Sequence, residues 1–191
     1  VSKSQKIVVG YLSGDFNDHP VAQAIEPAFR LHDRNRFEIV ACSYGPVDSS
    51  SYSQSIRSHS DKWLNLRDLS DYEAAVKIQE SGVQILVDLA GHTRNNRIAI
   101  MAYRPSPLQC LYMGYPATSG ADFIDYYLAD CKVLPEEHAE HFSEKVEYLD
   151  SYYHLVDESH SIGETVSRAS QKLPEDSFVF SSFVASYKIT A

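Results

Sequence analysis

The sequence is poor in cysteine. Only three cysteines occur among the 191 residues, at Cys42, Cys110 and Cys131, and no two of them are spaced as CxxC. Two of the three lie inside apolar strand-like runs, and an odd count without close pairs argues against a disulfide framework or a cysteine-based zinc site. We therefore expect buried free thiols and a reducing, cytoplasmic environment.

Basic residues and long apolar runs are also scarce. Lys and Arg number 17 against 26 Asp and Glu, for a formal net charge of -9. Nucleic acids and anionic membranes are recognised by basic surfaces, so neither is expected as a main partner. No apolar run approaches the roughly 18 residues of a membrane-spanning helix. The N-terminal residues Val1–Lys6 lack the apolar segment of a signal peptide.

Apolar runs alternate with amphipathic stretches over the first 150 residues. This alternation is typical of an α/β fold with a doubly wound, mostly parallel sheet. Strands are expected over residues 6–12, 37–44, 62–66, 83–88, 108–113, 124–129 and 145–149, and helices over 21–31, 52–59, 70–81, 98–103 and 135–141. Pro27 is expected to kink the first helix.

The composition changes after residue 150. Residues 151–172 are polar, rich in Ser and His, and without a sustained period, which predicts a linker. Phe178–Phe183 then reads as a new strand. We expect an amino-terminal lobe over 1–150, a linker over 151–172, and over 173–191 the start of a second lobe that is cut short after its first strand.

Polar loops follow three of the expected strands. They are Asp15–His19, Asp88–Asn96 and Tyr115–Ser119, and the central one follows the apolar run that begins at Val83. Ligands of open α/β sheets bind outside the carboxyl ends of the strands. If the strands are parallel, we expect these loops to meet at one crevice that could hold a polyhydroxylated ligand.

Each candidate residue also has a purely structural interpretation. His19 at a helix start could serve as a general base, or Asp18 and His19 could simply cap the helix. His92 could line a site or satisfy carbonyls of its own turn. Asp88 is harder to explain structurally, because a carboxylate at the end of a buried strand needs partners.

Two further motifs favour structural roles. Tyr115-Pro116 could be rigid turn chemistry. His138 and His141 are spaced like a pair of metal ligands on a helix, but no third ligand lies near them in the sequence. A surface helix is the better interpretation, and no metal site is expected.

Six blocks of sequence, in order, resemble a known family. They are Val9-Gly-Tyr-Leu-Ser-Gly-Asp-Phe16, His19-Pro20, Ile85 to Thr93 with Asn96-Arg97, Arg104-Pro-Ser-Pro-Leu-Gln109, Gly114-Tyr-Pro-Ala-Thr-Ser-Gly120 with Asp125-Tyr126, and Phe180 to Ile189. In these blocks the chain resembles the amino-terminal half of the catalytic region of protein O-linked N-acetylglucosamine transferases, whose family includes the plant SPINDLY-type protein O-fucosyltransferases.

The resemblance implies a GT-B fold of two Rossmann-like lobes. It also implies inverting, metal-independent transfer of a sugar from a nucleotide donor to Ser or Thr hydroxyls. The sugar expected first is N-acetylglucosamine, with UDP-N-acetylglucosamine or another nucleotide sugar as the donor. No other cofactor is implied, and family members usually carry tetratricopeptide repeats ahead of this region. The implied residues are, for catalysis, His19 and His92; for the substrates, Asp88, Thr93, Tyr115, Pro116 and Thr118; and for the nucleotide phosphates, Tyr187 and Lys188.

The chain departs from the family pattern in its last residues. Val184 and Ala185 follow Phe183, where the family usually has an amide side chain that can bond the nucleotide. With the second lobe cut short, we expect this chain to be inactive alone. The alternatives are a non-catalytic module that binds a sugar or a partner, and a glycosyltransferase of the same fold with a small-molecule acceptor.

Overall fold

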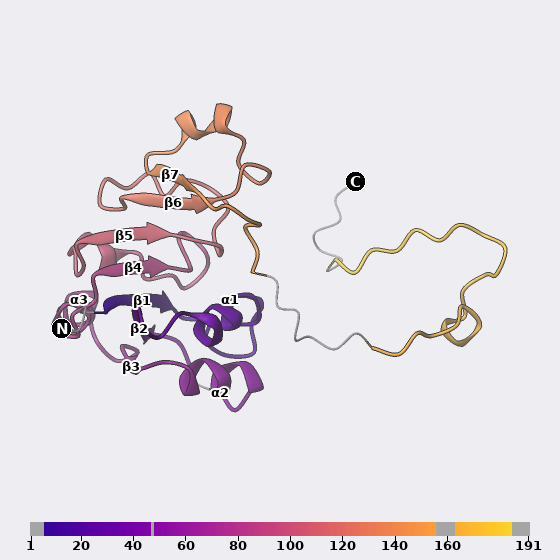
Figure 1. Cartoon of the computed structure of the whole chain (residues 1–191), viewed down its shortest axis with the longest axis horizontal. Helices are drawn as coiled ribbons and strands as arrows, with labels where there is room; N and C mark the ends of the chain where they lie inside the picture. Colours follow the sequence, from indigo (N-terminus) through magenta and orange to yellow (C-terminus); the bar gives the residue numbers. More distant parts are fainter. Residues whose placement is uncertain (1–5, 47, 156–162, 185–191) are drawn as a thin grey trace. The chain divides into compact units, whose positions relative to one another are not determined.

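The computed structural model describes residues 6–46, 48–155 and 163–184. The chain divides into two compact units, the first ending at Asp157 and the second beginning at Glu158. The first unit contains one seven-stranded sheet in the order β3-β2-β1-β4-β5-β6-β7. Each neighbouring pair of strands is parallel, and the arrows of β1, β4, β5 and β6 in Figure 1 point the same way.

Strands and helices alternate along the first unit. The strands are β1 (Ile7–Ser13), β2 (Phe37–Ser43), β3 (Lys62–Asn65), β4 (Ile85–Asp88), β5 (Leu108–Leu111), β6 (Tyr126–Ala129) and β7 (Lys145–Tyr148). The helices are α1 (Pro20–Leu31), α2 (Ser51–Ser58), α3 (Asp71–Glu80), α4 (Ala99–Ala102) and the 3-10 helix η1 (Glu136–His141). The predicted Rossmann-like α/β sheet is confirmed.

Two apolar cores cover the two faces of the sheet. Successive side chains of a strand point to opposite faces, so Tyr11 and Leu12 of β1 belong to different cores. On the Leu12 side the sheet packs against α3 and α4, and on the Tyr11 side against α1 and α2. Burial on both faces explains why β1 and β2 are almost continuously apolar.

Local signals set the ends of the helices. Helix α3 begins with the predicted capping box, in which the Glu73 N–H donates to Ser70 Oγ (3.3 Å) and the Ser70 N–H donates to Glu73 Oε2 (2.8 Å). Gly82 follows at φ 79°, a conformation that suits glycine. Helix α1 begins at Pro20 and continues through Pro27 to Leu31.

Several expected elements are shorter or of another kind. Strand β5 ends at Leu111, two residues earlier than predicted, because Met113 takes a positive φ of 71° that leaves the strand conformation. Strand β6 begins at Tyr126 and not at Ile124, and η1 is a 3-10 helix, which suits a piece of only six residues.

The first unit extends into the residues expected to form the linker. Tyr153 is only 5% exposed. Its N–H donates to Asp130 Oδ2 (2.5 Å), and its carbonyl accepts from the Tyr112 hydroxyl (2.5 Å). These bonds fasten the chain beyond β7 to the sheet.

The predicted strand over residues 178–183 is not observed. The described part of the second unit holds the short 3-10 helix η2 (Ala169–Gln171) and otherwise irregular chain. Phe178, Phe180 and Phe183 are 82%, 92% and 99% exposed. A strand needs a neighbour for its N–H and C=O groups, and no strand among the described residues pairs with this segment.

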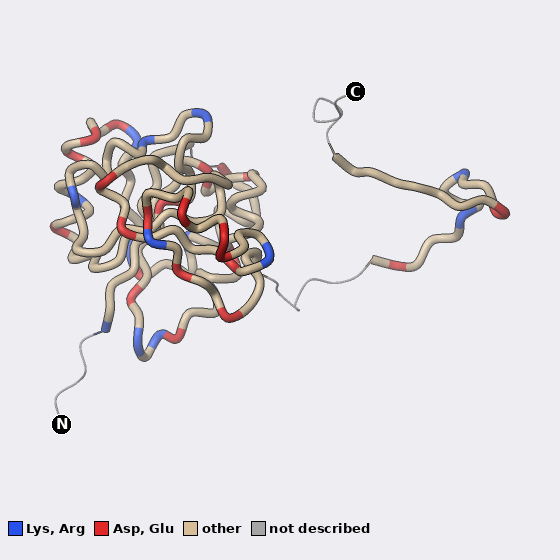
Figure 2. Tube along the Cα trace, turned by 90° about the horizontal axis from the view of Figure 1, so that it is seen from above, with Lys and Arg blue, Asp and Glu red and all other residues tan. Residues whose placement is uncertain are grey.

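Charged residues are interspersed along the described chain, as Figure 2 shows, with acidic ones in the majority over the whole sequence. Among the described residues, no helix has the length and hydropathy needed to cross a membrane.

Candidate functional site

The topology places three of the polar loops side by side. Strand β1 lies between β2 and β4, so the chain order reverses there, and β5 lies on the other side of β4. Helix α1 leaves β1 toward one face, while α3 and α4 cover the other. This is the switch point at which open α/β sheets bind ligands. The loops after β1, β4 and β5 therefore share one edge of the sheet (Figure 1).

His19 is the N-cap of α1 and remains partly open to solvent. Its Nδ1 accepts from the Val21 N–H (3.2 Å) and lies 3.8 Å from Asp15 Oδ2, and its side chain is 43% exposed. Because Nδ1 accepts, the proton of the neutral ring is on Nε2. His19 thus caps the helix with one nitrogen and offers a hydrogen-bond donor with the other.

Asp88 ends β4 and is fully buried. Its carboxylate accepts from the Gly91 N–H (2.7 Å) and the Ala90 N–H (3.3 Å). Burial raises the pKa of Asp88 to about 7, although these two bonds and the nearby His92 pull the pKa down. The carboxylate faces the backbone of the turn that carries His92, so Asp88 shapes this loop from inside.

His92 connects the loops that follow β4 and β5. Its Nε2 lies 2.8 Å from the Ser119 carbonyl oxygen, and its ring meets the Tyr115 ring edge-on at 5.4 Å. A carbonyl can only accept, so Nε2 carries the proton and Nδ1 of the neutral ring keeps its lone pair. His92 and Tyr115 are brought together, whereas no bond or ring contact within the described residues links either to His19.

The other predicted substrate residues serve the loops in different ways. Thr93 Oγ1 donates to the Ala90 carbonyl (2.8 Å), which closes the turn after β4. Thr118 Oγ1 donates to Glu144 Oε2 (2.7 Å). Pro116 is exposed beside Tyr115. Tyr187 and Lys188, the predicted phosphate contacts, lie outside the described residues, as does Ala185.

Sequence reasoning missed Glu144, which is only 3% exposed. Its carboxylate holds the loop after β5 through Thr118 and Ser119. Nothing in the local sequence sets Glu144 apart from Glu136, Glu137 and Glu140, which lie a few residues earlier and are exposed. Only the tertiary fold distinguishes it.

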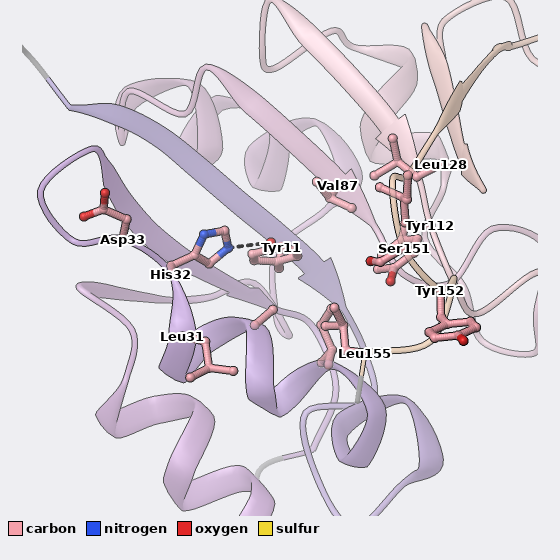
Figure 3. Close-up of a pocket in the computed structure, with 13 residues that line it drawn as sticks. Tyr11, Leu31, His32, Asp33, Val87, Tyr112, Leu128, Ser151, Tyr152 and Leu155 are labelled. Carbon is pink, nitrogen blue, oxygen red and sulfur yellow. Dashed lines mark hydrogen bonds between the residues drawn. The ribbon is translucent and has the colours of Figure 1, made fainter. Parts of the chain in front are cut away.

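A cavity lies elsewhere, on the Tyr11 face of the sheet (Figure 3). It measures about 410 Å³ and has a mostly apolar lining. Its residues are Tyr11, Val87, Tyr112 and Leu128 from the sheet, Ile25, Ala28, Leu31, His32 and Asp33 from α1 and its end, and Leu149, Ser151, Tyr152 and Leu155 after β7. The Tyr11 hydroxyl and His32 Nε2 are 2.8 Å apart at its wall. None of the predicted site residues lines this cavity. The candidate site therefore remains at the carboxyl ends of β1, β4 and β5, where the polar loops lie.

A close backbone approach holds the loops after β4 and β5 together. A Cβ on Gly114 would lie 1.9 Å from the Leu89 carbonyl oxygen, whereas one on Gly120 would meet nothing within 4 Å. We expect Gly114→Ala to lower the free energy of unfolding by about 3 kcal/mol, at the upper end of overpacking costs.

Gly120→Ala is the matched control in the same loop. Gly120 has φ 68°, so alanine there should cost only about 1 kcal/mol of backbone strain. Urea denaturation of both variants measures the difference. Equal losses would show that the contact between Gly114 and Leu89 does not limit the packing of the two loops.

A doubly wound parallel sheet with polar loops at the carboxyl ends of β1, β4 and β5 defines a Rossmann-like α/β lobe. Comparison with known proteins narrows this class. A family model described as Glycosyl transferase family 41 matches residues 1–165. The chain belongs to glycosyl transferase family 41.

Individual relatives agree with this assignment. The chain is 32% identical over 191 residues to a protein of Arabidopsis thaliana named probable UDP-N-acetylglucosamine–peptide N-acetylglucosaminyltransferase SEC, a match that covers 97% of this chain and 20% of the relative. It is 32% identical over 158 residues to the UDP-N-acetylglucosamine–peptide N-acetylglucosaminyltransferase of Caenorhabditis elegans, covering 82% of this chain and 14% of the relative.

A solved structure shares the fold. A mutant of the O-GlcNAc transferase of Thermobaculum terrenum superposes with a TM-score of 0.75 at 30% identity, over 81% of this chain and 30% of that one. The chain therefore spans less than a third of the length of these relatives. The match confirms that the lobe is of the kind found in GT-B glycosyltransferases.

Proposed function

We propose that this chain is the amino-terminal lobe of an inverting protein O-glycosyltransferase. The parent protein transfers N-acetylglucosamine from UDP-N-acetylglucosamine to Ser or Thr hydroxyls. The names of the relatives in Arabidopsis thaliana and Caenorhabditis elegans support this donor and a peptide acceptor. The proposal includes a cytoplasmic location, tetratricopeptide repeats in the parent chain and a reaction without metal. It also assigns Tyr187 and Lys188 to the nucleotide phosphates.

One observation carries the proposal. Two imidazoles stand in the loops after the adjacent strands β1 and β4 and keep opposite nitrogens free. His19 offers an N–H donor at Nε2, and His92 offers a lone pair at Nδ1. A transfer that removes a proton from one oxygen and develops charge on another needs one group of each kind.

These roles give a balanced reaction. The Ser or Thr oxygen forms a bond to the anomeric carbon of the sugar, and its proton passes to His92 Nδ1. The bond between that carbon and the diphosphate oxygen breaks, and the nucleoside diphosphate leaves with the electron pair. His19 Nε2–H donates a hydrogen bond to an oxygen of the nucleotide sugar on which negative charge develops. Tyr115 packs against the His92 ring and limits its rotation.

The full-length parent protein tests this directly. It should transfer label from radioactive UDP-N-acetylglucosamine to a Ser/Thr peptide, at a rate that EDTA leaves unchanged. Labelled GDP-fucose serves as the competing donor, and a fucose preference would correct the donor assignment. If neither donor labels the peptide, the transferase proposal fails, and a sugar- or partner-binding module becomes the better explanation.

A further inference from the structure

The buried carboxylate of Glu144 touches none of the reacting groups proposed above, yet it is tied to one of them through a single residue. Oε1 accepts from the Ser119 N–H (2.7 Å) and from the Ser119 hydroxyl. Oε2 accepts from Thr118 Oγ1 (2.7 Å) and from the Ser143 hydroxyl (3.2 Å). Every one of these donors is neutral and belongs to the loop after β5 or to the residue beside Glu144.

A buried charge is costly unless hydrogen bonds replace its water. Here the four bonds satisfy both oxygens of the carboxylate. Burial opposes ionisation of Glu144, but the bonds from Ser119 and Thr118 outweigh it and hold the pKa of Glu144 below its ordinary value. The group is thus a fixed anion around which the loop is folded.

The loop after β5 in turn fixes the direction of the Ser119 carbonyl. Thr118 Oγ1 also accepts from the Gly120 N–H (3.1 Å), and Gly120 takes φ 68°. These contacts orient the peptide group that joins residues 119 and 120. The carbonyl of that group is the one that faces His92 Nε2 at 2.8 Å.

We propose that Glu144 is a positioning residue that, through Ser119, holds the proton of His92 on Nε2 and thereby keeps Nδ1 free to accept a proton. The inference rests on the proposed function for its catalytic meaning. The arrangement of Glu144, Ser119 and His92 itself is independent of which substrate is bound.

Glu144→Gln is the informative change. A glutamine is nearly the same size but has one oxygen and one NH₂ group, so the NH₂ would face donors of the loop. At least one of the bonds to Ser119 or Thr118 is lost, and the Ser119 carbonyl is released. His92 should then sample both neutral tautomers.

Nitrogen NMR of the 191-residue chain, labelled with ¹⁵N-histidine, reads this out without any activity. Above the titration range, His92 of the unaltered chain should show two widely separated nitrogen shifts, assigned by their loss in His92→Gln. In Glu144→Gln the two shifts should move toward each other. Glu140→Gln, exposed and four residues earlier, should leave them unchanged.

A second variant, Ser119→Ala, tests the inference if Glu144→Gln does not fold. Ser119→Ala removes the Ser119 hydroxyl that Glu144 holds and keeps the backbone carbonyl, so it should shift the His92 signals in the same direction by less. Far-UV circular dichroism confirms that each variant is folded. Unchanged His92 shifts in a folded Glu144→Gln or, if that variant does not fold, in Ser119→Ala would overturn the inference.

Kinetics in the full-length parent protein separate this inference from the proposed function. Glu144→Gln should lower kcat by about 10- to 100-fold with little change in KM, because misplacing a reacting group costs rate more than ground-state binding. Glu144→Asp, which keeps the charge, should recover part of that loss. If the unaltered parent transfers no sugar, the proposed function fails while the NMR result still decides the role of Glu144. An unchanged kcat in an active Glu144→Gln parent would contradict the inference.

Discussion

Replacing His19 by asparagine in the parent protein is expected to lower kcat/KM for glycosyl transfer by about 100- to 1,000-fold, the usual cost of losing one donor to a developing charge. The same change should alter the free energy of unfolding by no more than about 0.5 kcal/mol. Asparagine is as good an N-cap as any residue, so it replaces the bond from the Val21 N–H while removing the donor at Nε2.

Two further variants complete the experiment on His19. His19→Ala should show the same kinetic loss and, in addition, a destabilisation of about 1 kcal/mol from the missing cap. His138→Asn, on the exposed helix η1, should change neither quantity. A His19→Asn enzyme with normal kinetics would mean that His19 is a helix cap and nothing more, since that variant keeps the cap and loses only the imidazole.

Asp88→Asn is expected to remove a large pH dependence of folding stability. The carboxyl group of Asp88 has an ordinary pKa of 3.8 and a pKa of about 7 in the folded chain. Between these values the folded state holds a proton that the unfolded state has released, so the stability that Asp88 contributes is greatest below pH 4 and is lost as pH rises toward 7. At 1.36 kcal/mol per unit, the full change is about 4 kcal/mol.

The measurement compares how the free energy of unfolding changes with pH in the unaltered chain and in Asp88→Asn. Urea denaturation of the unaltered chain and of Asp88→Asn at about pH 4 and pH 8 should show the unaltered chain losing about 4 kcal/mol relative to the variant. Taking the difference cancels groups that titrate alike in both chains. Asp122→Asn, at an exposed position of the same unit, should show no comparable change. A constant difference between the unaltered chain and Asp88→Asn across pH would show that Asp88 is ionised when buried.

The link between Asp88 and His92 makes the Asp88 experiment relevant to the site. The turn after β4 is closed by bonds to the Asp88 carboxylate, and this turn presents His92 to the loop after β5. When Asp88 ionises, its two acceptor oxygens strengthen the bonds to the backbone N–H groups. The ionisation of Asp88 thus affects how firmly the turn after β4 holds His92, the proposed proton acceptor.

The sequence alone determined the fold class and the helix starts, because these depend on signals that are local. The apolar runs of β1 and β4, the capping box of Ser70 and Glu73, and Gly82 at the end of α3 act over a few residues and hold in almost any context. The order of the family blocks likewise followed from the residues themselves.

The tertiary structure decided where the side chains face and which of them meet. The sequence did not show that Asp88 turns inward, that His19 and His92 keep opposite nitrogens free, or that Glu144 anchors the loop after β5. Residues 178–183 likewise form no strand in this structure, because no strand among the described residues lies beside them to pair with. The central run from Val83 to Arg97 looked like one wall of a crevice, and its geometry depends on Ser119 and Glu144, which lie more than twenty residues further along. Hydrogen bonds between distant segments depend on packing, and packing is a property of the whole chain.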